Sequence, residues 1–359
     1  MDIALLRRRF VTHGLRLLAG DGRAPSIDWP LRQSGILRIL VCRTSQSLGN
    51  TLLITPLLQE IEAIWPGAEI DIVTRNPAST QIFAGYASVR DVYCLPRRAA
   101  SAPIELARQL HKLRRNRYDL AIDSDPRSRT SRALLALSRA RFKLGFVGAG
   151  KNAGLTHAID IAGAPPHAGQ IPVYLLRQAL HRSAIDYPSL DLRLTAAERE
   201  QGSAILARLV AQSAASAKRG TIGVFANATG HKRRDAEWWR AFLPAIESAY
   251  PDFNFIEIAP GDGVSLLDGR YPAYYSSSVR KLARVLSGLS MVISLDCGIM
   301  HLARASGTKT AAVFTVTDSA QWGPYGAGAF VIDAHDQSPE RAARGLVDAA
   351  VPELLFSAT

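Results

Sequence analysis

The sequence predicts an α/β protein built from two parallel-sheet domains. Two observations point to this fold class. Short β-branched runs alternate with longer helical patterns, as in βαβ units, and the alternation starts a second time near residue 196. The 359 residues can form two cores, and 47% hydrophobic with 21% charged residues is a globular composition. No short-period repeat is visible, which argues against solenoid and propeller folds.

We expect the chain to divide into four segments. Residues 1–34 form an appendage and linker, residues 35–195 the first domain and residues 196–336 the second domain. Residues 337–359 end in a helix that we expect to return to the first domain. The appendage mixes leucines with arginines and reads as a basic amphipathic helix (Arg7, Arg8, Arg9, Arg16). Such a helix lies on an anionic membrane surface or packs against its own domain, and the sequence leaves both open.

In the first domain, apolar runs predict strands at residues 36–42, 69–74 and 118–123. A helix over residues 50–64 is expected from apolar positions three and four residues apart, with Pro56 tolerated in its early turns. An Arg-rich helix is expected at residues 104–115.

The second domain repeats this pattern after a polar, Ala-rich helix over residues 195–217. Strands are expected at residues 221–226, 254–259, 291–295 and 310–316, alternating with helices at residues 235–250, 279–287, 299–306 and 339–350.

Charge and cysteine content narrow the function classes. The net charge is +12, and the stretch from Arg97 to Lys151 alone holds 14 basic and four acidic residues. Such a stretch is a solvated basic face or attracts anionic lipids or phosphorylated sugars. No RNP-like or zinc-finger pattern accompanies it, so we do not expect a nucleic-acid partner. Three cysteines exclude a disulfide framework and a cysteine zinc site, and without a signal-peptide pattern we expect a cytoplasmic protein.

Three segments that follow predicted strands are candidates for chemistry. The first leads from Arg43 through Ser47 and Gly49 to Asn50 at a helix start. The second carries a hydroxyl and an ammonium three residues apart, Thr229 and Lys232, a pattern suited to clamping a phosphate. In the third, from Asp296 to His301, we expect Asp296 to cap a helix whose start holds a diphosphate. Taken alone, the first segment is explained about as well by an ordinary turn, and for the other two an ordinary surface loop and a structural histidine are the favoured explanations.

Taken in order, these segments resemble the bacterial lipopolysaccharide heptosyltransferase family, glycosyltransferase family nine, over residues 36–330. The resemblance is carried by residues 36–56, the Trp65-Pro66-Gly67-Ala68 turn, residues 118–123 and the Thr229/Lys232 loop before Trp238. It ends in a specific signature from Asp296 to Ala303, followed by residues 314–318 and 322–326.

The resemblance implies a GT-B architecture, two Rossmann-like domains facing across a cleft. It implies a metal-independent, inverting transferase without a cofactor, using ADP-heptose or another nucleotide diphosphate sugar and an anionic glycolipid or glycan acceptor at the inner membrane. Donor binding is implied for matching positions of the second domain (Thr229, Lys232, Asp296, Cys297, Gly298, His301). Ser47 and Gly49 match the acceptor-side loop.

The sequence departs from the family at the expected catalytic base. The family's aspartate position is held by Asn50, and a neutral amide cannot accept a proton near neutral pH. Asp123 and Asp125 are therefore candidate substitute bases. Cys297 stands where the family commonly has Ser or Thr.

Three functions remain open at this point. The first is a heptosyltransferase-like glycosyltransferase of the cell envelope, in which the Arg97–Lys151 stretch holds an anionic acceptor. The second is an inert nucleotide-sugar-binding scaffold or regulator of glycan assembly. The third is a nucleotide-sugar epimerase of the same fold, which needs no acceptor.

Overall fold

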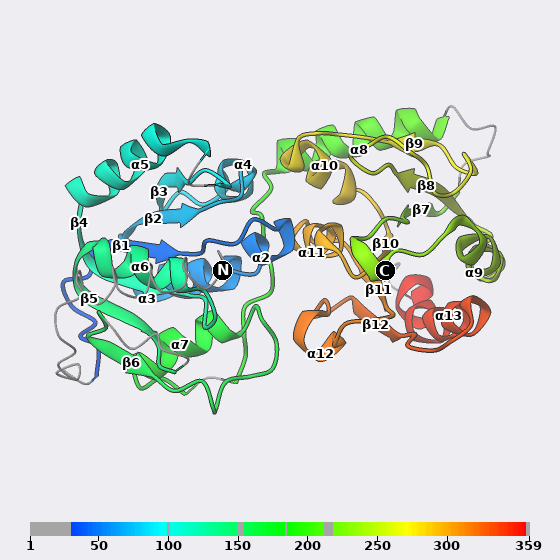
Figure 1. Ribbon diagram of the computed structural model, residues 1–359. Coiled ribbons are helices and arrows are strands. Elements are labelled where there is room, and N and C mark those ends of the chain that lie inside the picture. Colours follow the sequence, from blue (N-terminus) through cyan, green and yellow to red (C-terminus); the bar gives the residue numbers. More distant parts are fainter. Residues whose placement is uncertain (1–29, 99–100, 149–153, 184, 212–217, 357–359) are drawn as a thin grey trace, which may run out of the picture. The chain divides into compact units, whose positions relative to one another are not determined.

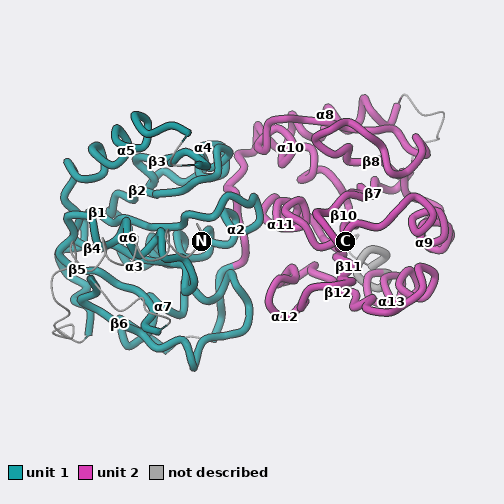
Figure 2. The backbone as a smooth tube through the Cα atoms, in the orientation of Figure 1, with its two compact units in different colours: residues 1–188 teal, residues 189–359 magenta. Residues whose placement is uncertain are grey.

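The computed structural model describes residues 30–98, 101–148, 154–183, 185–211 and 218–356 (Figure 1). Most of the predicted N-terminal appendage, including Arg7, Arg8, Arg9 and Arg16, lies outside these residues. The chain divides into two compact units, residues 1–188 and 189–359 (Figure 2). We expected the division after residue 195. It lies earlier because Leu190, Leu192 and Leu194 are buried, and the Leu192 N–H donates to the Ala305 carbonyl of the second unit at 2.8 Å.

The first unit is a six-stranded parallel sheet in the order β3-β2-β1-β4-β5-β6. Its central strands are β1 (Arg38–Cys42), β2 (Glu69–Thr74) and β4 (Arg117–Asp123), at the positions that the sequence predicts. The outer strands are β3 (Val89–Cys94), β5 (Arg139–Phe146) and β6 (His157–Ile159). Polar residues interrupt β3 and β5, which is why their hydrophobic pattern is weak.

Helices cover both faces of this sheet. On one face, α5 (Pro103–Arg115) and α6 (Arg129–Leu137) pack over a core that includes Leu40 and Cys42. On the other side, α3 (Thr55–Ile64) packs against α7 (Ile171–Ala179). The short helices are α2 (Leu48–Leu52) and α4 (Ser79–Phe83).

The prediction of a single helix over residues 50–64 is wrong, because two helices, α2 and α3, occupy this stretch. Helix α2 starts two residues earlier and ends with Leu53 as its C-cap. Pro56 then lies in the first turn of α3, where its missing N–H costs nothing. As a result Gly49 and Asn50 lie within α2 and not in a loop before a helix.

The second unit is also a six-stranded parallel sheet, in the order β12-β11-β10-β7-β8-β9. Its strands are β7 (Gly220–Phe225), β8 (Phe253–Ile258), β9 (Ala273–Tyr274), β10 (Met291–Leu295), β11 (Thr310–Phe314) and β12 (Ala329–Asp333). Its helices are α8 (Ala196–Ala211), α9 (Ala236–Ala249), α10 (Val279–Leu286), α11 (Gly298–Ala305), α12 (Ser319–Trp322) and α13 (Pro339–Phe356), with a 3₁₀ turn η2 (Gly230–Lys232).

The prediction for the C-terminal helix is also wrong. We expected it to return to the first domain, but α13 packs within the second unit against α9 and β12. Ala342, Ala343 and Leu346 are fully buried in the same core as Trp239 and Phe242 of α9. The small residues of α13 allow this close packing, so the helix completes the second domain (Figure 1).

Both sheets have the strand order 3-2-1-4-5-6 of Rossmann folds when the strands are numbered within each unit. The prediction of two Rossmann-like domains is therefore confirmed. In such sheets the order reverses between the first and fourth strands, here β1 and β4 in one unit and β7 and β10 in the other. Ligands bind beyond the carboxyl ends of strands at this point. The three candidate segments follow β1, β7 and β10.

Candidate functional site

Lys232 and Asp296, both predicted to bind the donor, are brought together at the reversal point of the second sheet. Lys232 lies in η2 after β7, and Asp296 directly follows β10, the neighbour of β7. The Lys232 Nζ atom donates to Asp296 Oδ2 at 3.1 Å. Asp296 is 7% exposed, whereas the Lys232 side chain keeps 25% of its surface exposed. The ammonium is thus held in place on a side chain that is partly exposed to solvent.

Thr317 completes this cluster, and the sequence analysis gave it no role. Its hydroxyl donates to the same Asp296 oxygen that accepts from Lys232. Thr317 follows β11, the neighbour of β10 on the other side. It lies within the stretch 314–318 that supports the family resemblance. The sequence feature that could have identified Thr317 is its position just after a strand that is fully buried.

Asp296 does not cap α11, as we expected from the sequence. The N-cap is Cys297, in extended conformation (φ −159°, ψ 176°), and the helix begins at Gly298. Because Cys297 and not Asp296 holds the N-cap position, the Asp296 carboxylate is available to Lys232 and Thr317.

The other predicted donor residues lie close to this cluster in sequence but differ in exposure. Thr229 precedes η2 and is exposed. His301 lies inside α11 and is only 4% exposed, so its ring belongs to the interior of the unit. The Cys297 sulfur lies 3.2 Å from Ser294 Oγ, and burial raises the pKa of the thiol. Cys297 is therefore not a reactive thiolate near neutral pH.

In the first unit, the loop after β1 is tightly hydrogen-bonded. The Ser47 hydroxyl caps α2 by accepting from the Asn50 N–H at 3.3 Å. The Asn50 side-chain amide in turn donates to Ser45 Oγ at 3.1 Å. From the loop after β2, the Asn76 amide donates to Thr51 Oγ1 at 2.9 Å and to the Ser47 carbonyl at 3.3 Å. Asn50 is therefore held in one orientation at the carboxyl edge of the sheet.

Arg43 is a residue at this edge that the sequence analysis did not single out. It is 6% exposed, and its Nε donates to the Asn50 carbonyl at 3.2 Å. One Nη lies 3.8 Å from Asp125 Oδ2, and burial lowers the pKa of the guanidinium. A charged residue immediately after a buried strand was its signal. Arg43 connects the loops after β1 and β4.

Asp123 does not fit the role of a substitute base. It is fully buried, and Arg132 Nε of α6 donates to its carboxylate at 3.0 Å. A carboxylate enclosed in this way cannot meet an acceptor hydroxyl, which corrects that expectation. The Asp125 side chain is 20% exposed and accepts from the N–H groups of Arg127 and Ser128 at 2.8 and 3.0 Å. It organises the turn before α6, and its role as a base stays a prediction.

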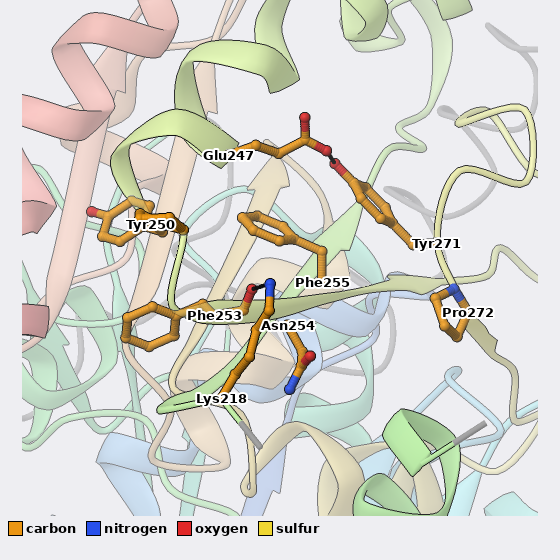
Figure 3. Close-up of a pocket in the computed structure, with 9 residues that line it drawn as sticks. Lys218, Glu247, Tyr250, Phe253, Asn254, Phe255, Tyr271 and Pro272 are labelled. Carbon is orange, nitrogen blue, oxygen red and sulfur yellow. Dashed lines mark hydrogen bonds between the residues drawn. The ribbon is translucent and has the colours of Figure 1, made fainter. Parts of the chain in front are cut away.

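Figure 3 shows a shallow hollow at the opposite edge of the second sheet, where β7 and β8 begin. It has a volume of about 330 Å³ and is lined by Lys218 and by aromatic rings that include Phe255 and Tyr271. These two rings stack with centroids 5.5 Å apart, and Lys218 Nζ donates to the Phe253 carbonyl at 3.1 Å. The predicted donor residues do not line this hollow, so it is separate from the candidate site. Within the described ranges, no three His, Cys, Asp or Glu side chains gather as a metal site requires.

Several solved structures with a similar fold carry the names of glycosyltransferases. The chain is similar to the glycosyl transferase family 9 structure from Veillonella parvula, with a TM-score of 0.73, 17% identity and coverage of 91% of this chain and 99% of that one. For E. coli heptosyltransferase WaaC with ADP, the TM-score is 0.68 at 23% identity, covering 89% and 100%. For E. coli ADP-heptose lps heptosyltransferase II, it is 0.64 at 15%, covering 88% and 99%. No curated protein sequence matches the chain.

The two Rossmann-like units and these likenesses show that the chain has the GT-B fold. Residues 277–348 match the sequence model of Glycosyltransferase family 9 (heptosyltransferase). This segment runs from before α10 into α13 and includes Asp296 and Thr317. This match confirms the resemblance to the heptosyltransferase family over these residues.

Proposed function

We propose that this protein transfers a sugar from a nucleotide diphosphate sugar to a glycan or glycolipid of the cell envelope, at the cytoplasmic face of the inner membrane. The observation that supports donor binding is the cluster of Lys232, Asp296 and Thr317 beside the start of α11. A diphosphate is the ligand that suits an oriented ammonium and the N–H groups of a helix start. The names of related structures, which include ADP and ADP-heptose, make ADP-heptose the first donor to test.

In this reaction an acceptor hydroxyl attacks the anomeric carbon, and the bond from that carbon to the diphosphate oxygen breaks with inversion. The negative charge that develops on the leaving diphosphate is stabilised by Lys232 and the N-terminus of α11. Asp296 contributes by orienting the ammonium. These groups do the work that a metal ion does in other transferases, so we propose that the reaction is metal-independent.

The proton released by the acceptor needs a base, and the N-terminal unit offers few. Asn50 holds the family's base position with a neutral amide, and Asp123 is enclosed with Arg132. Asp125 keeps one-fifth of its side chain exposed and is therefore the carboxylate that we propose as the substitute base. A missing general base typically slows a reaction by about 10²–10⁴-fold, so slow transfer survives even without one.

The shortage of candidate bases in the first unit favours a second candidate function, an inert nucleotide-sugar-binding scaffold in glycan assembly. An amide at position 50 and an arginine-paired Asp123 are compatible with donor binding without transfer. The two functions differ in one measurable product, the glycosylated acceptor.

The test starts with a thermal-shift screen of ADP-, UDP- and GDP-sugars, because a ligand that binds only the folded protein raises its melting temperature. The donor found is then titrated by calorimetry and incubated with an acceptor panel, with and without EDTA. Donor binding with EDTA-insensitive transfer supports the transferase, and binding without transfer across the panel supports the scaffold. If no nucleotide sugar shifts the melting temperature, both proposals are refuted.

A further inference from the structure

The outward side of α5 carries a strongly basic surface that the proposed reaction does not use. Leu106, Leu110 and Leu113 pack toward the core of the first unit. Opposite them, at three- and four-residue spacing, lie five exposed residues that we call the α5 outer face (Ile104, Arg108, His111, Lys112, Arg115). Figure 1 shows α5 at the border of its unit, covering the sheet with one side only.

Basic residues far outnumber acidic ones on and around this face. Glu105 is the acidic residue of α5, and it pairs with Arg108 of the next turn. Lys112, Arg114 and Arg115 fill the last turn of the helix. The exposed residues Arg97 and Arg98 precede the helix, and exposed Arg117 follows it. Cations in the last turn are favourable for the helix itself, but a single acidic residue leaves this surface strongly positive.

The α5 outer face also exposes an apolar residue at its first turn. Ile104 is 84% exposed as a residue, and Pro103 and Ala107 beside it are also exposed. A soluble polyanion has no apolar layer to receive such a side chain. A bilayer interface has one, because helices at the membrane surface bury apolar residues at the headgroup boundary while their basic residues meet anionic lipids.

We propose that the α5 outer face docks the first unit on a bilayer rich in anionic lipid. The contact that we propose is a peripheral one. In the described part of the chain no helix is long and apolar enough to span a membrane. The inference deepens the proposed function, on which it rests, by naming the surface that brings the enzyme to a lipid-linked acceptor.

The test compares two triple variants of the full chain with equal loss of charge. One is Arg108→Gln, Lys112→Gln and Arg115→Gln in the α5 outer face. The matched control is Lys281→Gln, Arg341→Gln and Arg344→Gln, three exposed residues of the second unit. Partition to phosphatidylglycerol–phosphatidylcholine vesicles is measured by co-sedimentation, with phosphatidylcholine vesicles as the neutral reference. Because three basic residues near the surface are removed, the α5 triple should weaken binding roughly 100-fold.

The control triple should weaken it less than about threefold, and added salt should abolish the difference because it screens exposed charges. Equal losses in the two triples, or no loss in the α5 triple, would overturn the proposal. Repeating the comparison after deletion of residues 1–20 separates the α5 contribution from that of the N-terminal arginines. A loss confined to the α5 triple in both backgrounds supports the proposal.

Ile104→Ser distinguishes a bilayer from a soluble polyanion. The variant should lower vesicle binding about threefold or more and leave binding to heparin unchanged. Unchanged vesicle binding by Ile104→Ser, with heparin binding lost in the α5 triple, would assign the face to a soluble polyanion and overturn the proposal. Donor affinity and transfer to a water-soluble acceptor are measured on the same variants. If the proposed function is wrong, donor binding and transfer will not be detected. If only the docking surface is wrong, donor binding and transfer will be detected, but the α5 triple will bind vesicles as well as the control triple does.

Discussion

Lys232 and Asp296, 64 residues apart in the sequence, are joined by a 3.1 Å contact at the adjoining carboxyl ends of β7 and β10. The two side chains differ in exposure: the Asp296 side chain is 9% exposed and the Lys232 side chain 25% exposed. In this geometry the Asp296 carboxylate fixes the position of the Lys232 ammonium, which can then bind an anionic ligand. The first prediction follows from it.

Lys232→Ala should weaken donor binding roughly 10- to 100-fold, since a charge-assisted contact contributes about 1.5–3 kcal/mol. Calorimetry with the donor found in the nucleotide-sugar screen measures the effect. Lys281→Ala, on an exposed part of α10 in the same unit, is the matched control and should bind normally. Unchanged affinity in Lys232→Ala would remove this lysine from the donor site.

Asn50→Asp should raise turnover at least about tenfold, because it restores a carboxylate at the family's base position. The structure supports the substitution: Ser45 Oγ, 3.1 Å from the Asn50 amide nitrogen, can donate to a carboxylate there. A negative charge in the first turn of α2 should hold or slightly raise the melting temperature. Initial rates with a fixed donor and acceptor measure the effect. Asn50→Ala serves as the control, and equal rates in the two variants would exclude position 50 as a base.

Asp125→Asn should lower transfer by about 10²-fold or more if Asp125 is the substitute base. The amide keeps an oxygen that can accept from the Arg127 and Ser128 N–H groups, so folding should change little. A pH–rate profile is the decisive readout, since the rate limb of a titrating base should disappear in the variant. Transfer that persists in Asp125→Asn with the same profile as wild type would contradict this assignment.

Asp123→Asn should act on stability rather than on chemistry. The Asp123–Arg132 pair is buried, with exposed side-chain fractions of 0% and 2%, and breaking such a pair leaves an uncompensated charge. We expect a loss of about 3–5 kcal/mol in the free energy of unfolding, measured by urea denaturation. The double variant Asp123→Leu with Arg132→Met should lose less than either single change. A fully stable Asp123→Asn that has lost transfer would instead restore Asp123 as a base.

Glu198 provides a pH prediction for the second unit. Hydrogen bonds from Arg280 and Arg284 of α10 and from the Thr195 N–H lower the pKa of Glu198 to about 2. Because the folded pKa lies below the unfolded one, the stabilisation is present above about pH 4.5 and is lost as the pH falls toward 2. Glu198→Gln should therefore lower the free energy of unfolding by about 1–3 kcal/mol at pH 7. The difference from the wild type should become smaller between pH 4.5 and pH 2.5. A gap that stays constant over that range would contradict the ion-pair account.

The sequence by itself determined the fold class and the strands at the centre of each sheet. Strands such as β1 and β10 are mostly apolar, since a strand covered by helices on both faces needs few polar residues. The outer strands β3 and β5 could not be recognised in this way. Their charged residues find partners only in the folded unit, as Arg90 of β3 does with Asp71 of β2 at 2.6 Å.

Only the tertiary structure decided how the site residues meet. Lys232, Asp296 and Thr317 were each placed after a strand by the sequence, but their contacts depend on β7, β10 and β11 being neighbours. The burial of Asp123 with Arg132 depends in the same way on α6 covering the end of β4. Local sequence patterns determine strands and helices because those depend on near neighbours in the chain. The partner of a charged side chain is decided by strand order and helix packing, which join residues far apart in sequence.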